Sequence, residues 1–320
     1  MIRPAKWQGL GNDYLIMEEG ALPGSLTPEA IGLLCDRHLG VGSDGILLHT
    51  APSGAVPGAV ARMRIFNPDG SEPEMCGNGI RMFARYLAQT GVAADKEFIV
   101  ETLAGPIKPR LMDDGSVRVD MGRARFNSPN IAPEACELPA GADVVDAELQ
   151  AGCWDCRFTF VDVGNPHCVV FVDDPAVFDV AGVGARIEHN RLFPNRTNVE
   201  FVRMEPDGSV RMRVWERGVG ETQACGTGAT AVGAACVRLG LAESPVLVHL
   251  LGGDLSIEVE AAGDAVNAPG AAAAGDAEGP GAADARALRV FMTGPAEEVF
   301  TCRLSADLMT RLGWQTRAAD

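Results

Sequence analysis

Apolar residues along the chain follow two spacings, one typical of helices and one typical of short strands. Two segments keep the i, i+3, i+4, i+7 spacing of a helix with a single apolar face: Ile80, Phe83, Ala84 and Leu87 in the first, and Val232, Cys236 and Leu239 in the second. Gly91 and Gly240 follow these segments, and glycine commonly ends a helix. We therefore predict two helices that stop before these glycines.

Short apolar runs bounded by turn residues predict strands. The expected strands are 6–17, interrupted by two glycines, and 46–48, 62–66, 98–101, 107–111, 117–121, 158–162, 169–172, 199–204, 210–215, 255–260, 287–292 and 299–304. Thr27 to Leu39 begins with a Thr cap and a proline, which predicts a helix, and Asp179 to His189 predicts another. A short helix is expected after the last strand. The mixture predicts an α+β fold.

The two amphipathic segments begin at motifs that repeat each other. Cys76-Gly77-Asn78-Gly79 returns as Cys225-Gly226-Thr227-Gly228, 149 positions later (225 − 76 = 149). At the same offset Arg62-Met63-Arg64-Ile65-Phe66 falls on Arg211-Met212-Arg213-Val214-Trp215, and Glu72 falls on Glu221. Such self-similarity indicates an internal duplication of a strand–turn–helix unit. A Gly-Asn pair also precedes an apolar strand in each half, so we expect Asn12 and Asn165 at related places.

The duplication predicts two domains, for which a length of 320 residues is sufficient. We expect a first half-domain over 1–122 that carries Cys76, completed by a C-terminal return at 295–320. The second, over 123–294, should carry Cys225. Residues 261–285 are almost wholly Ala, Gly, Asp and Pro, a composition that buries little apolar surface. We interpret this segment as an inserted hairpin tip without a catalytic role.

Composition narrows the class of protein. The net charge is −16, with 43 acidic and 27 basic residues, which disfavours binding to nucleic acid or to an anionic membrane. No apolar run approaches the roughly 18 residues of a membrane span. The first residues lack the apolar core of a signal peptide. We therefore expect a soluble cytoplasmic protein.

Nine cysteines, an odd number at irregular positions, disfavour a disulfide scaffold. Cys153 and Cys156 form a C-x-x-C, but neither a βαβ context nor a second pair accompanies it, so a metal or redox role there is disfavoured. An isolated free cysteine is usually a small core residue. Duplication of the whole motif favours a functional reading for Cys76 and Cys225 instead.

A cysteine at the start of a helix has a distinct chemistry. The first backbone N–H groups of a helix have no intrahelical partners, and the aligned peptide dipoles add partial positive charge there. We expect this environment to lower the thiol pKa and to attract a carboxylate. Two such thiols at one anion site suggest inversion of a carbon next to a carboxylate: one thiolate removes the proton from one face, and the other thiol returns a proton to the opposite face.

At this point the motifs resemble those of the diaminopimelate epimerase family. The resemblance covers nearly the whole chain and rests on four segments: Gly9-x-Gly11-Asn12-Asp13, Asn67 through Arg81, Gly164-Asn165-Pro166-His167, and Glu216 through Gly228. It implies two pseudo-symmetric domains, each a curled, mostly antiparallel sheet or barrel around a central helix, with the active site in the interdomain cleft. It also implies a homodimer that needs neither a cofactor nor a metal and acts on diaminopimelate in lysine and peptidoglycan precursor synthesis.

The resemblance further assigns roles to residues. It implies that Cys76 and Cys225 are the acid/base pair and that His167 and Glu216 tune the two thiol pKa values. The backbone N–H groups offered to the reacting carboxylate would come from Gly77, Asn78, Gly226 and Thr227. The remaining substrate contacts would be Asn12, Asn67, Asn165, Asn198, Glu216 and Arg217. Gly45 follows Asp44 where many family members have Gln, so no side-chain contact is carried over there.

The nearest alternative is an enzyme like proline racemase or hydroxyproline epimerase, with the same fold and cysteine pair. That family tends to have His after the first Cys-Gly, where this chain has Asn78. Arg217 and the asparagines also favour a substrate with a second, amino-acid-like end. A binding protein without catalysis would not need both thiols. In a thiol-redox protein, Cys76 and Cys225 would form a disulfide.

Overall fold

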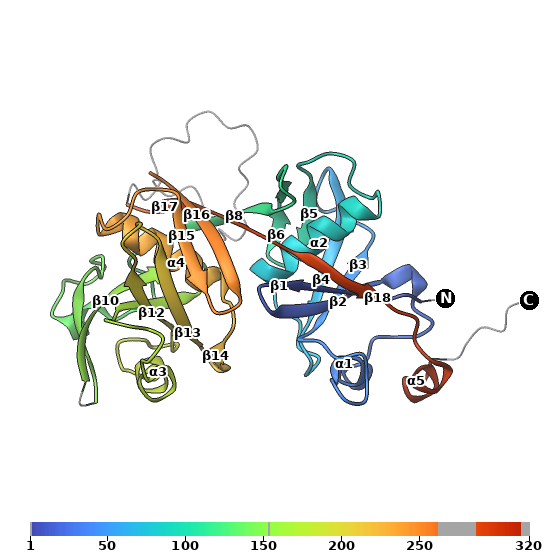
Figure 1. The fold of residues 1–320 in the computed structure, drawn as a ribbon, viewed down its shortest axis with the longest axis horizontal. Helices are drawn as coiled ribbons and strands as arrows, with labels where there is room; N and C mark the ends of the chain where they lie inside the picture. Colours follow the sequence, from blue (N-terminus) through green and yellow to red (C-terminus); the bar gives the residue numbers. More distant parts are fainter. Residues whose placement is uncertain (1, 153, 262–285, 315–320) are drawn as a thin grey trace, which may run out of the picture. The chain divides into compact units, whose positions relative to one another are not determined.

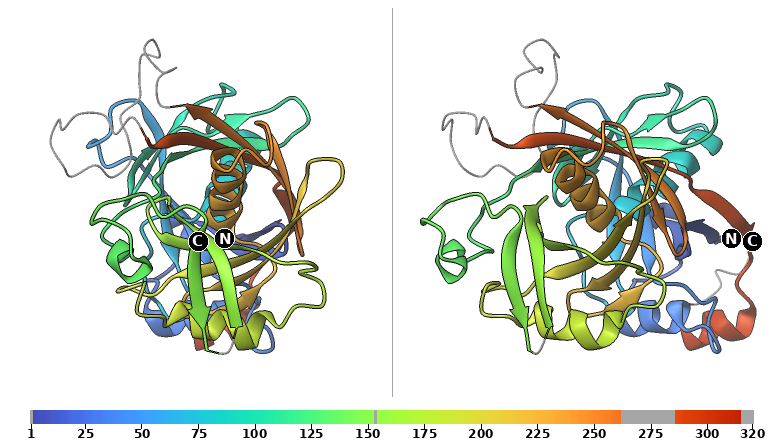
Figure 2. Two further views of the ribbon diagram at one scale, coloured as in Figure 1. Left: turned by 90° about the vertical axis from the view of Figure 1, so that its left-hand side faces the viewer. Right: turned by 60° about the vertical axis from the view of Figure 1, so that its left-hand side comes forward.

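The computed structural model describes residues 2–152, 154–261 and 286–314 (Figures 1 and 2). The described chain divides into two compact units. The first holds 2–119 and 294–314, and the second holds 120–152, 154–261 and 286–293, so the boundary lies between Val119 and Asp120. Cys153 and nearly all of the proposed 261–285 insertion lie outside the described residues. No helix of the described chain is long and apolar enough to cross a membrane.

The first unit is built on a seven-stranded sheet in the order β18-β1-β2-β3-β4-β5-β6. The strands are β1 (Ala5–Gly9), β2 (Asn12–Glu18), β3 (Ile46–Thr50), β4 (Ala59–Phe66), β5 (Ile99–Thr102), β6 (Gly105–Ile107) and β18 (Glu297–Thr301). Its helices are α1 (Pro28–Cys35), α2 (Gly77–Gln89), α5 (Ala306–Arg311) and a 3₁₀ turn, Glu19–Ala21. Only the β2/β3 and β4/β5 pairs are parallel among the described pairs.

The second unit contains most of an eleven-stranded sheet in the order β7-β8-β17-β16-β15-β13-β12-β11-β10-β9, with β14 beside β13. The strands are β7 (Arg110–Leu111), β8 (Val117–Ala124), β9 (Ala147–Ala151), β10 (Trp154–Asp162), β11 (Pro166–Phe171), β12 (Asn198–Met204), β13 (Val210–Glu216), β14 (Gly220–Thr222), β15 (Val246–Leu250), β16 (Gly253–Ala261) and β17 (Leu288–Gly294). The helices are α3 (Val180–Glu188), α4 (Gly226–Arg238) and a 3₁₀ turn, Pro133–Cys136.

The duplication extends to the whole topology. Strands β1 to β6 with α1 and α2 correspond in order and in pairing sense to β10, β11, β12, β13, β15 and β16 with α3 and α4. The register agrees as well, because Leu47 lies opposite Ile65 and Glu200 lies opposite Val214, and Ile65 and Val214 are 149 positions apart (214 − 65 = 149). The predicted α+β fold of two duplicated sheets is confirmed, and neither strand order closes into a barrel among the described residues.

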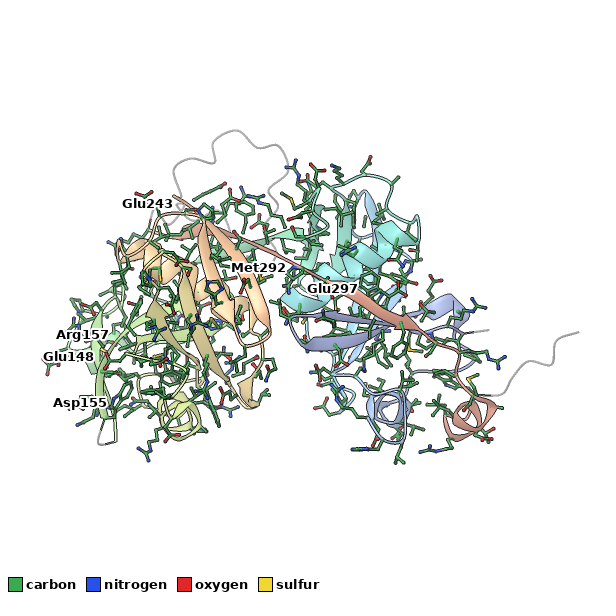
Figure 3. All side chains as sticks on the ribbon, in the orientation of Figure 1. Glu148, Asp155, Arg157, Glu243, Met292 and Glu297 are labelled. Atoms are coloured by element: carbon green, nitrogen blue, oxygen red, sulfur yellow. The ribbon has the colours of Figure 1, made fainter. Side chains whose placement is uncertain are left out.

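Each unit buries one helix of the duplicated pair against its sheet. In the second unit α4 packs against β10, β11, β12, β15 and β16, and Figure 2 shows it inside a curved set of strands. Close packing is possible because the buried face of α4 is made of small residues, including Ala231, Gly233 and Ala234. Met292 of β17 is also buried, whereas charged side chains such as Glu148 and Asp155 lie at the surface (Figure 3).

Local signals account for the differences from the predicted elements. The predicted strand 6–17 is a hairpin, because Leu10 and Gly11 have positive φ angles of 60° and 84° and reverse the chain. The predicted helix to Leu39 ends at Cys35, where the Asp36 carboxylate accepts the N–H groups of residues 38 and 39 in a competing turn. The predicted strand 107–111 breaks at Pro109, which has no N–H for a ladder.

Gly233 provides a test of the α4 packing. A Cβ at this position would lie 2.5 Å from Cγ2 of Ile257 on β16. Gly233→Ala should therefore destabilise the protein by about 1–3 kcal/mol, although alanine favours a helix over glycine. Urea unfolding measures the change, with Gly20→Ala as the control, because a Cβ at exposed Gly20 meets nothing within 4 Å. A stabilised Gly233→Ala variant would contradict the described packing.

Candidate active site

Cys76 is the N-cap of α2. Its backbone is extended (φ −141°, ψ 117°), and its Sγ accepts the N–H of Gly79 at 3.3 Å. The hydroxyl of Tyr14 on β2 donates to the same sulfur at 3.7 Å. Cys76 is half-buried at the start of the helix. The sequence predicted this placement at the positive end of a helix dipole.

A chain of polar side chains continues from the start of α2. Arg81 Nη2 donates to Asn78 Oδ1 at 2.9 Å, Asn78 Nδ2 donates to Asn12 Oδ1 at 3.3 Å, and Asn12 Nδ2 donates to Asp44 Oδ2 at 2.9 Å. Asn12 and Asn78, both predicted as site residues, are therefore held together. Asn67 is in the turn after β4, where its side chain donates to Ser71, a contact within its own turn.

Arg81 contacts a predicted site residue, Asn78, in a way that the sequence did not reveal. The side chain is fully buried, and burial lowers its pKa to about 10. It donates to the carbonyl oxygens of Gly77 and Pro295 and to Asn78. Arg85, one turn further along α2, donates to the carbonyl of Ala296 at 2.7 Å. These two arginines fasten the C-terminal return of the chain to the helix that carries Cys76.

Cys225 is the N-cap of α4 in the same geometry. Its backbone is extended (φ −123°, ψ 110°), its Sγ accepts the N–H of Gly228 at 3.3 Å, and the Thr227 hydroxyl lies 3.4 Å from the sulfur. Burial raises the pKa of the Cys225 thiol well above its usual value, and the carboxylates of Glu216 and Glu200 raise it further. The predicted lowering is wrong for this thiol, because desolvation and two negative charges outweigh the helix start.

His167 lies behind Cys225 in a buried polar network. Its Nδ1 is 2.6 Å from Glu200 Oε1, and its Nε2 is 3.0 Å from Asn165 Oδ1. Asn165 Nδ2 in turn donates to the Thr227 hydroxyl at 3.4 Å. His167 and Glu200 are both fully buried. The sequence analysis missed Glu200, although a glutamate within the apolar strand 199–204 was a usable signal.

Glu216, predicted to tune a thiol, lies beside Cys225. Burial raises the pKa of its carboxyl group, whereas hydrogen bonds from Thr222 and Cys225 and the charge of His167 oppose the rise. The Glu216 carboxyl and the Cys225 thiol thus share a buried, desolvated environment. The same burial raises the pKa of both groups.

Asn198 and Arg217 are adjacent, and the side chains of both make hydrogen bonds to backbone groups. Asn198 Oδ1 accepts the backbone N–H of Arg217 at 2.9 Å, and Asn198 Nδ2 donates to the carbonyl of Pro166 at 2.9 Å. Arg217 Nη1 donates to the carbonyl of Asn195 at 3.1 Å. Asn198 therefore positions the loop that carries the Arg217 guanidinium.

The two halves repeat contacts as well as elements. Asn12 contacts the residue two positions after Cys76, and Asn165 contacts the residue two positions after Cys225, so the two asparagines occupy related places. A bidentate ion pair also recurs at the offset of 149: Arg64 with Glu72 at 2.8 Å, and Arg213 with Glu221 at 2.6 and 2.9 Å. These pairs fix the turn before each cysteine to its strand.

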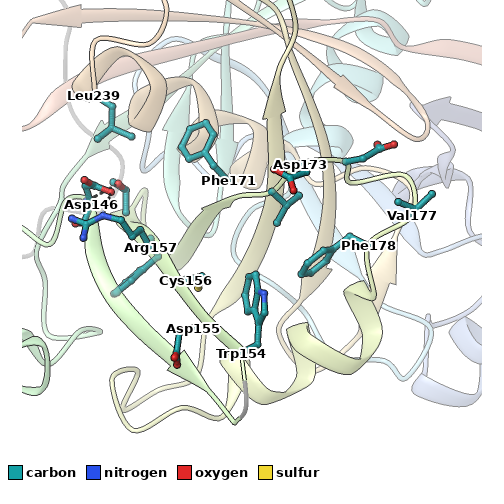
Figure 4. Close-up of a pocket in the computed structure, with 14 residues that line it drawn as sticks. Asp146, Trp154, Asp155, Cys156, Arg157, Phe171, Asp173, Val177, Phe178 and Leu239 are labelled. Atoms are coloured by element: carbon teal, nitrogen blue, oxygen red, sulfur yellow. Dashed lines mark hydrogen bonds and ion pairs between the residues drawn. The ribbon is translucent and has the colours of Figure 1, made fainter.

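A surface pocket of about 630 Å³ on the second unit is formed by other residues (Figure 4). Trp154, Cys156 and Phe178 line it, and none of the predicted site residues does. Burial and the neighbouring Asp155 raise the pKa of Cys156 to about 12, which keeps this thiol protonated and unreactive. The candidate active-site residues instead surround the starts of α2 and α4.

Comparison with known proteins gives consistent matches. A family model described as diaminopimelate epimerase matches residues 4–127 and 159–275. The diaminopimelate epimerase of Moorella thermoacetica is 45% identical over 302 residues, covering 92% of this chain and 96% of that protein. The enzyme of that name from Synechocystis sp. is 40% identical over 298 residues, covering 93% and 96%. A rice protein named chloroplastic diaminopimelate epimerase (Oryza sativa subsp. japonica) is 41% identical, covering 92% and 78%.

Solved structures share the fold at low sequence identity. A hydroxyproline epimerase from Agrobacterium vitis superposes with a TM-score of 0.61 at 16% identity, covering 96% of this chain and 93% of that one. A phenazine biosynthesis protein of the PhzF family from Bacillus anthracis gives 0.61 at 16%, covering 95% and 99%. These neighbours establish the two-domain fold alone.

The raised pKa of Glu216 predicts a pH-dependent difference in stability. A carboxyl group whose pKa is higher in the folded than in the unfolded protein binds its proton more tightly when folded, so it lowers stability as the pH rises above 4.5. Glu216→Gln removes this effect. The variant should gain unfolding free energy over the wild type between pH 4 and pH 8 in urea titrations. Exposed Glu243→Gln should show no such trend, and a pH-independent difference for Glu216→Gln would contradict the raised pKa.

Proposed function

The chain belongs to the diaminopimelate epimerase family, and from that premise we propose that it interconverts LL- and meso-diaminopimelate by inverting one α-carbon without a cofactor. The reaction would serve lysine and peptidoglycan precursor synthesis. The observation that carries the proposal is the pair of cysteine N-caps, Cys76 on α2 and Cys225 on α4, each with its sulfur on the N–H three residues ahead.

In the proposed mechanism the two thiols act on opposite faces of the α-carbon. One thiolate takes the α-proton, the C–H electron pair passes to the α-carbon and its carboxylate, and the other thiol returns a proton from the far side. The roles reverse in the opposite direction. The raised pKa of Cys225 supports a protonated thiol there, ready to donate, when the proton is taken by Cys76.

Backbone N–H groups are proposed to stabilise the negative charge that develops on the substrate carboxylate. They would come from Gly77 and Asn78 at the start of α2 and from Gly226 and Thr227 at the start of α4, where the helix dipoles add to the hydrogen bonds. Glycine at both first positions supports this role, since it keeps the backbone accessible.

Polar side chains are proposed to make the remaining substrate contacts, several of them at the distal, unreactive end. Asn12, Asn67, Asn165, Asn198 and Arg217 are the proposed contacts, together with Glu216. A planar guanidinium has five N–H groups, and the contact of Arg217 with Asn195 uses one nitrogen, which leaves donors for a second carboxylate. A substrate with two amino-acid ends fits these groups better than proline, which has one carboxylate.

Assembly and location belong to the same proposal. We expect a homodimer in the cytoplasm, as the family resemblance implies, acting on a free small molecule. The acidic net charge of −16 gives no support for a nucleic-acid or anionic membrane partner. Lysine and peptidoglycan precursors are small soluble molecules, which agrees with this location.

Solvent hydrogen exchange tests the activity. Reduced protein is incubated in deuterated water with LL-diaminopimelate and, separately, with L-proline, without added cofactor. Deuterium should enter the α-carbon of diaminopimelate together with inversion, as followed by mass spectrometry and chiral chromatography, because the returned proton comes from a thiol that exchanges with solvent. Exchange of proline alone would transfer the assignment to the racemase class, and exchange of neither substrate would remove the proposed function.

Cysteine variants test the two-base assignment. Cys76→Ala and Cys225→Ala should each lower the rate of inversion by about 10²–10⁴-fold, the usual contribution of one acid/base group. Cys302→Ala and Cys136→Ala are matched controls in the first and second units, and both should retain activity, since these thiols are outside the site. A loss below about tenfold at Cys76 or Cys225 would refute the pair.

Arg217→Met separates binding of the distal end from the chemical step. Loss of a charge-assisted contact with the unreactive carboxylate should raise KM for diaminopimelate about 10- to 100-fold with a smaller change in kcat. Arg191→Met, an exposed neighbour in sequence, is the control. A fall in kcat at unchanged KM would instead indicate that Arg217 acts on the reacting carbon.

A further inference from the structure

The duplicated halves differ at one buried position beside each cysteine. Leu47 on β3 and Glu200 on β12 occupy the same register position, opposite Ile65 and Val214. A Cβ on Gly79 would meet Leu47 Cδ2 at 3.1 Å, and a Cβ on Gly228 would meet Glu200 Oε1 at 2.8 Å. The chain thus places an aliphatic group behind Cys76 and a carboxylate behind Cys225.

The neighbouring strands differ in the same way. Tyr14 follows Gly11-Asn12 as His167 follows Gly164-Asn165, so the two side chains are equivalents. Tyr14 donates directly to Cys76 Sγ. His167 instead pairs with Glu200 and reaches toward Cys225 only through Asn165. One half therefore has a neutral Tyr/Leu pair and the other a His/Glu pair.

Glu200 has no evident structural purpose. Its side chain is fully buried, and its Oε2 has no hydrogen-bond partner among the described residues. A buried carboxylate lowers stability unless it is paired, and an aliphatic side chain of similar size is often the more stable choice. The first half has such an aliphatic side chain, Leu47, at the equivalent position. The carboxylate in the second half is better explained by a role in the chemistry of Cys225.

We propose that Glu200 is a positioning residue that holds a proton on His167 Nδ1 and orients a hydrogen-bond chain toward the Cys225 sulfur. The inference rests on the proposed function, in which Cys225 alternates between thiol and thiolate. A carboxylate only accepts hydrogen bonds, so the atom 2.6 Å away, Nδ1, must carry a hydrogen. Glu200 therefore fixes both the protonation and the orientation of the ring.

The remaining contacts set the direction of the chain. Asn165 presents its oxygen to Nε2, so this nitrogen also donates, and the imidazolium balances the Glu200 charge. Asn165 Nδ2 donates to Thr227 Oγ1, which leaves the Thr227 hydroxyl hydrogen for Cys225 Sγ at 3.4 Å. From His167 Nε2 onward, each link then donates toward the sulfur, which stabilises its thiolate. In the first half the chain from Arg81 runs instead to Asp44 and ends away from Cys76.

Two nearby carboxylates oppose a thiolate at Cys225, so a hydrogen-bond chain that stabilises the thiolate is needed. Glu216 on β13 and Glu200 on β12 both disfavour a thiolate at Cys225, and the hydrogen bonds from Thr227 and from the Gly228 N–H favour it. His167 on β11 supplies the positive charge that faces both carboxylates. Removing the Glu200 charge while keeping its shape takes away one negative charge that disfavours the Cys225 thiolate. It should also disturb the orientation and protonation of His167, and this second effect should be larger, since Glu200 contacts His167 directly.

Glu200→Gln is the first test. The pH profile of kcat/KM for diaminopimelate inversion should show a drop of about 10- to 100-fold, the range found for groups that orient metal-binding histidines, with the limb for Cys225 ionisation moved to higher pH. Glu200→Leu, which copies Leu47, should lose more. Glu243→Gln, an exposed Glu→Gln change in the same unit (Figure 3), should match the wild type. A Glu200→Gln enzyme with wild-type kcat/KM and an unshifted profile would overturn the proposal.

A second readout uses the wild-type protein and needs no activity. Nitrogen-15 labelling of the five histidines should show one ring whose Nδ1 carries a slowly exchanging hydrogen, assigned by its loss in His167→Gln. An unprotonated Nδ1 on His167 would overturn the proposal even if every Glu200 variant fails to fold. If wild-type protein does not exchange deuterium into substrate, the proposed function fails, and the Nδ1 signal still decides whether Glu200 holds His167.

The double variant His167→Tyr/Glu200→Leu gives the second half the Tyr/Leu pair that the first half has at Tyr14 and Leu47. It reuses a packing arrangement that the chain already contains at equivalent positions, so it should fold where Glu200→Leu alone leaves the histidine unpaired. The folded variant should remain weakly active, because a tyrosine at this place supplies no positive charge toward Glu216. Full activity in this variant would show that the charged pair is dispensable and would overturn the proposal.

Discussion

A cysteine sulfur that accepts the N–H three residues ahead is the interaction on which both halves of this protein depend. As an N-cap it satisfies one unpaired donor of the helix and fixes the entry of the chain, and it also holds the thiol at the positive end of the peptide dipoles. The position leaves little room for a side chain on the capped residue, since a Cβ on Gly79 or Gly228 would lie 3.3 Å from the Cβ of its cysteine. Strand, turn and helix are arranged around that contact: the Arg64–Glu72 and Arg213–Glu221 pairs fix the turn, and the strands bury the helix.

Much of this arrangement could be predicted from the sequence because the duplication supplies each observation twice. A single Cys-Gly-polar-Gly is ambiguous, but a second copy at a constant offset, with Arg, Glu and Gly in register, specifies two equal helices, and α2 and α4 have the same length and the same offset. The paired Gly-Asn motifs likewise predicted related places for Asn12 and Asn165. Local periodicity was sufficient wherever an element carries its own cap, as at Thr27 and Asp179.

Other features could not be predicted, because they depend on contacts between distant segments. The hairpin at Gly11 and the early end of α1 are decided by positive φ angles and by one aspartate side chain, which compete with propensity. The pKa of Cys225 is the larger difference between prediction and structure. The helix dipole was visible in the sequence, but the burial of the thiol and the charge of Glu200 beside it were not, and together with Glu216 these reverse the sign of the pKa shift. Asn67 was assigned by resemblance, and its structural contact is within its own turn.

The difference between the halves fits what the proposed two-base inversion needs. Two equivalent thiols would share one protonation state at a given pH, whereas inversion by two bases requires one thiolate and one thiol at the start of each turnover. A neutral Tyr14/Leu47 environment on one side and a charged His167/Glu200 environment on the other break that equivalence inside a symmetric scaffold. The buried carboxylate of Glu200, with His167, is then the element that makes the two halves chemically distinct. Duplication supplied the pair of helix starts, and divergence at two buried positions behind them supplied the asymmetry that the proposed mechanism needs.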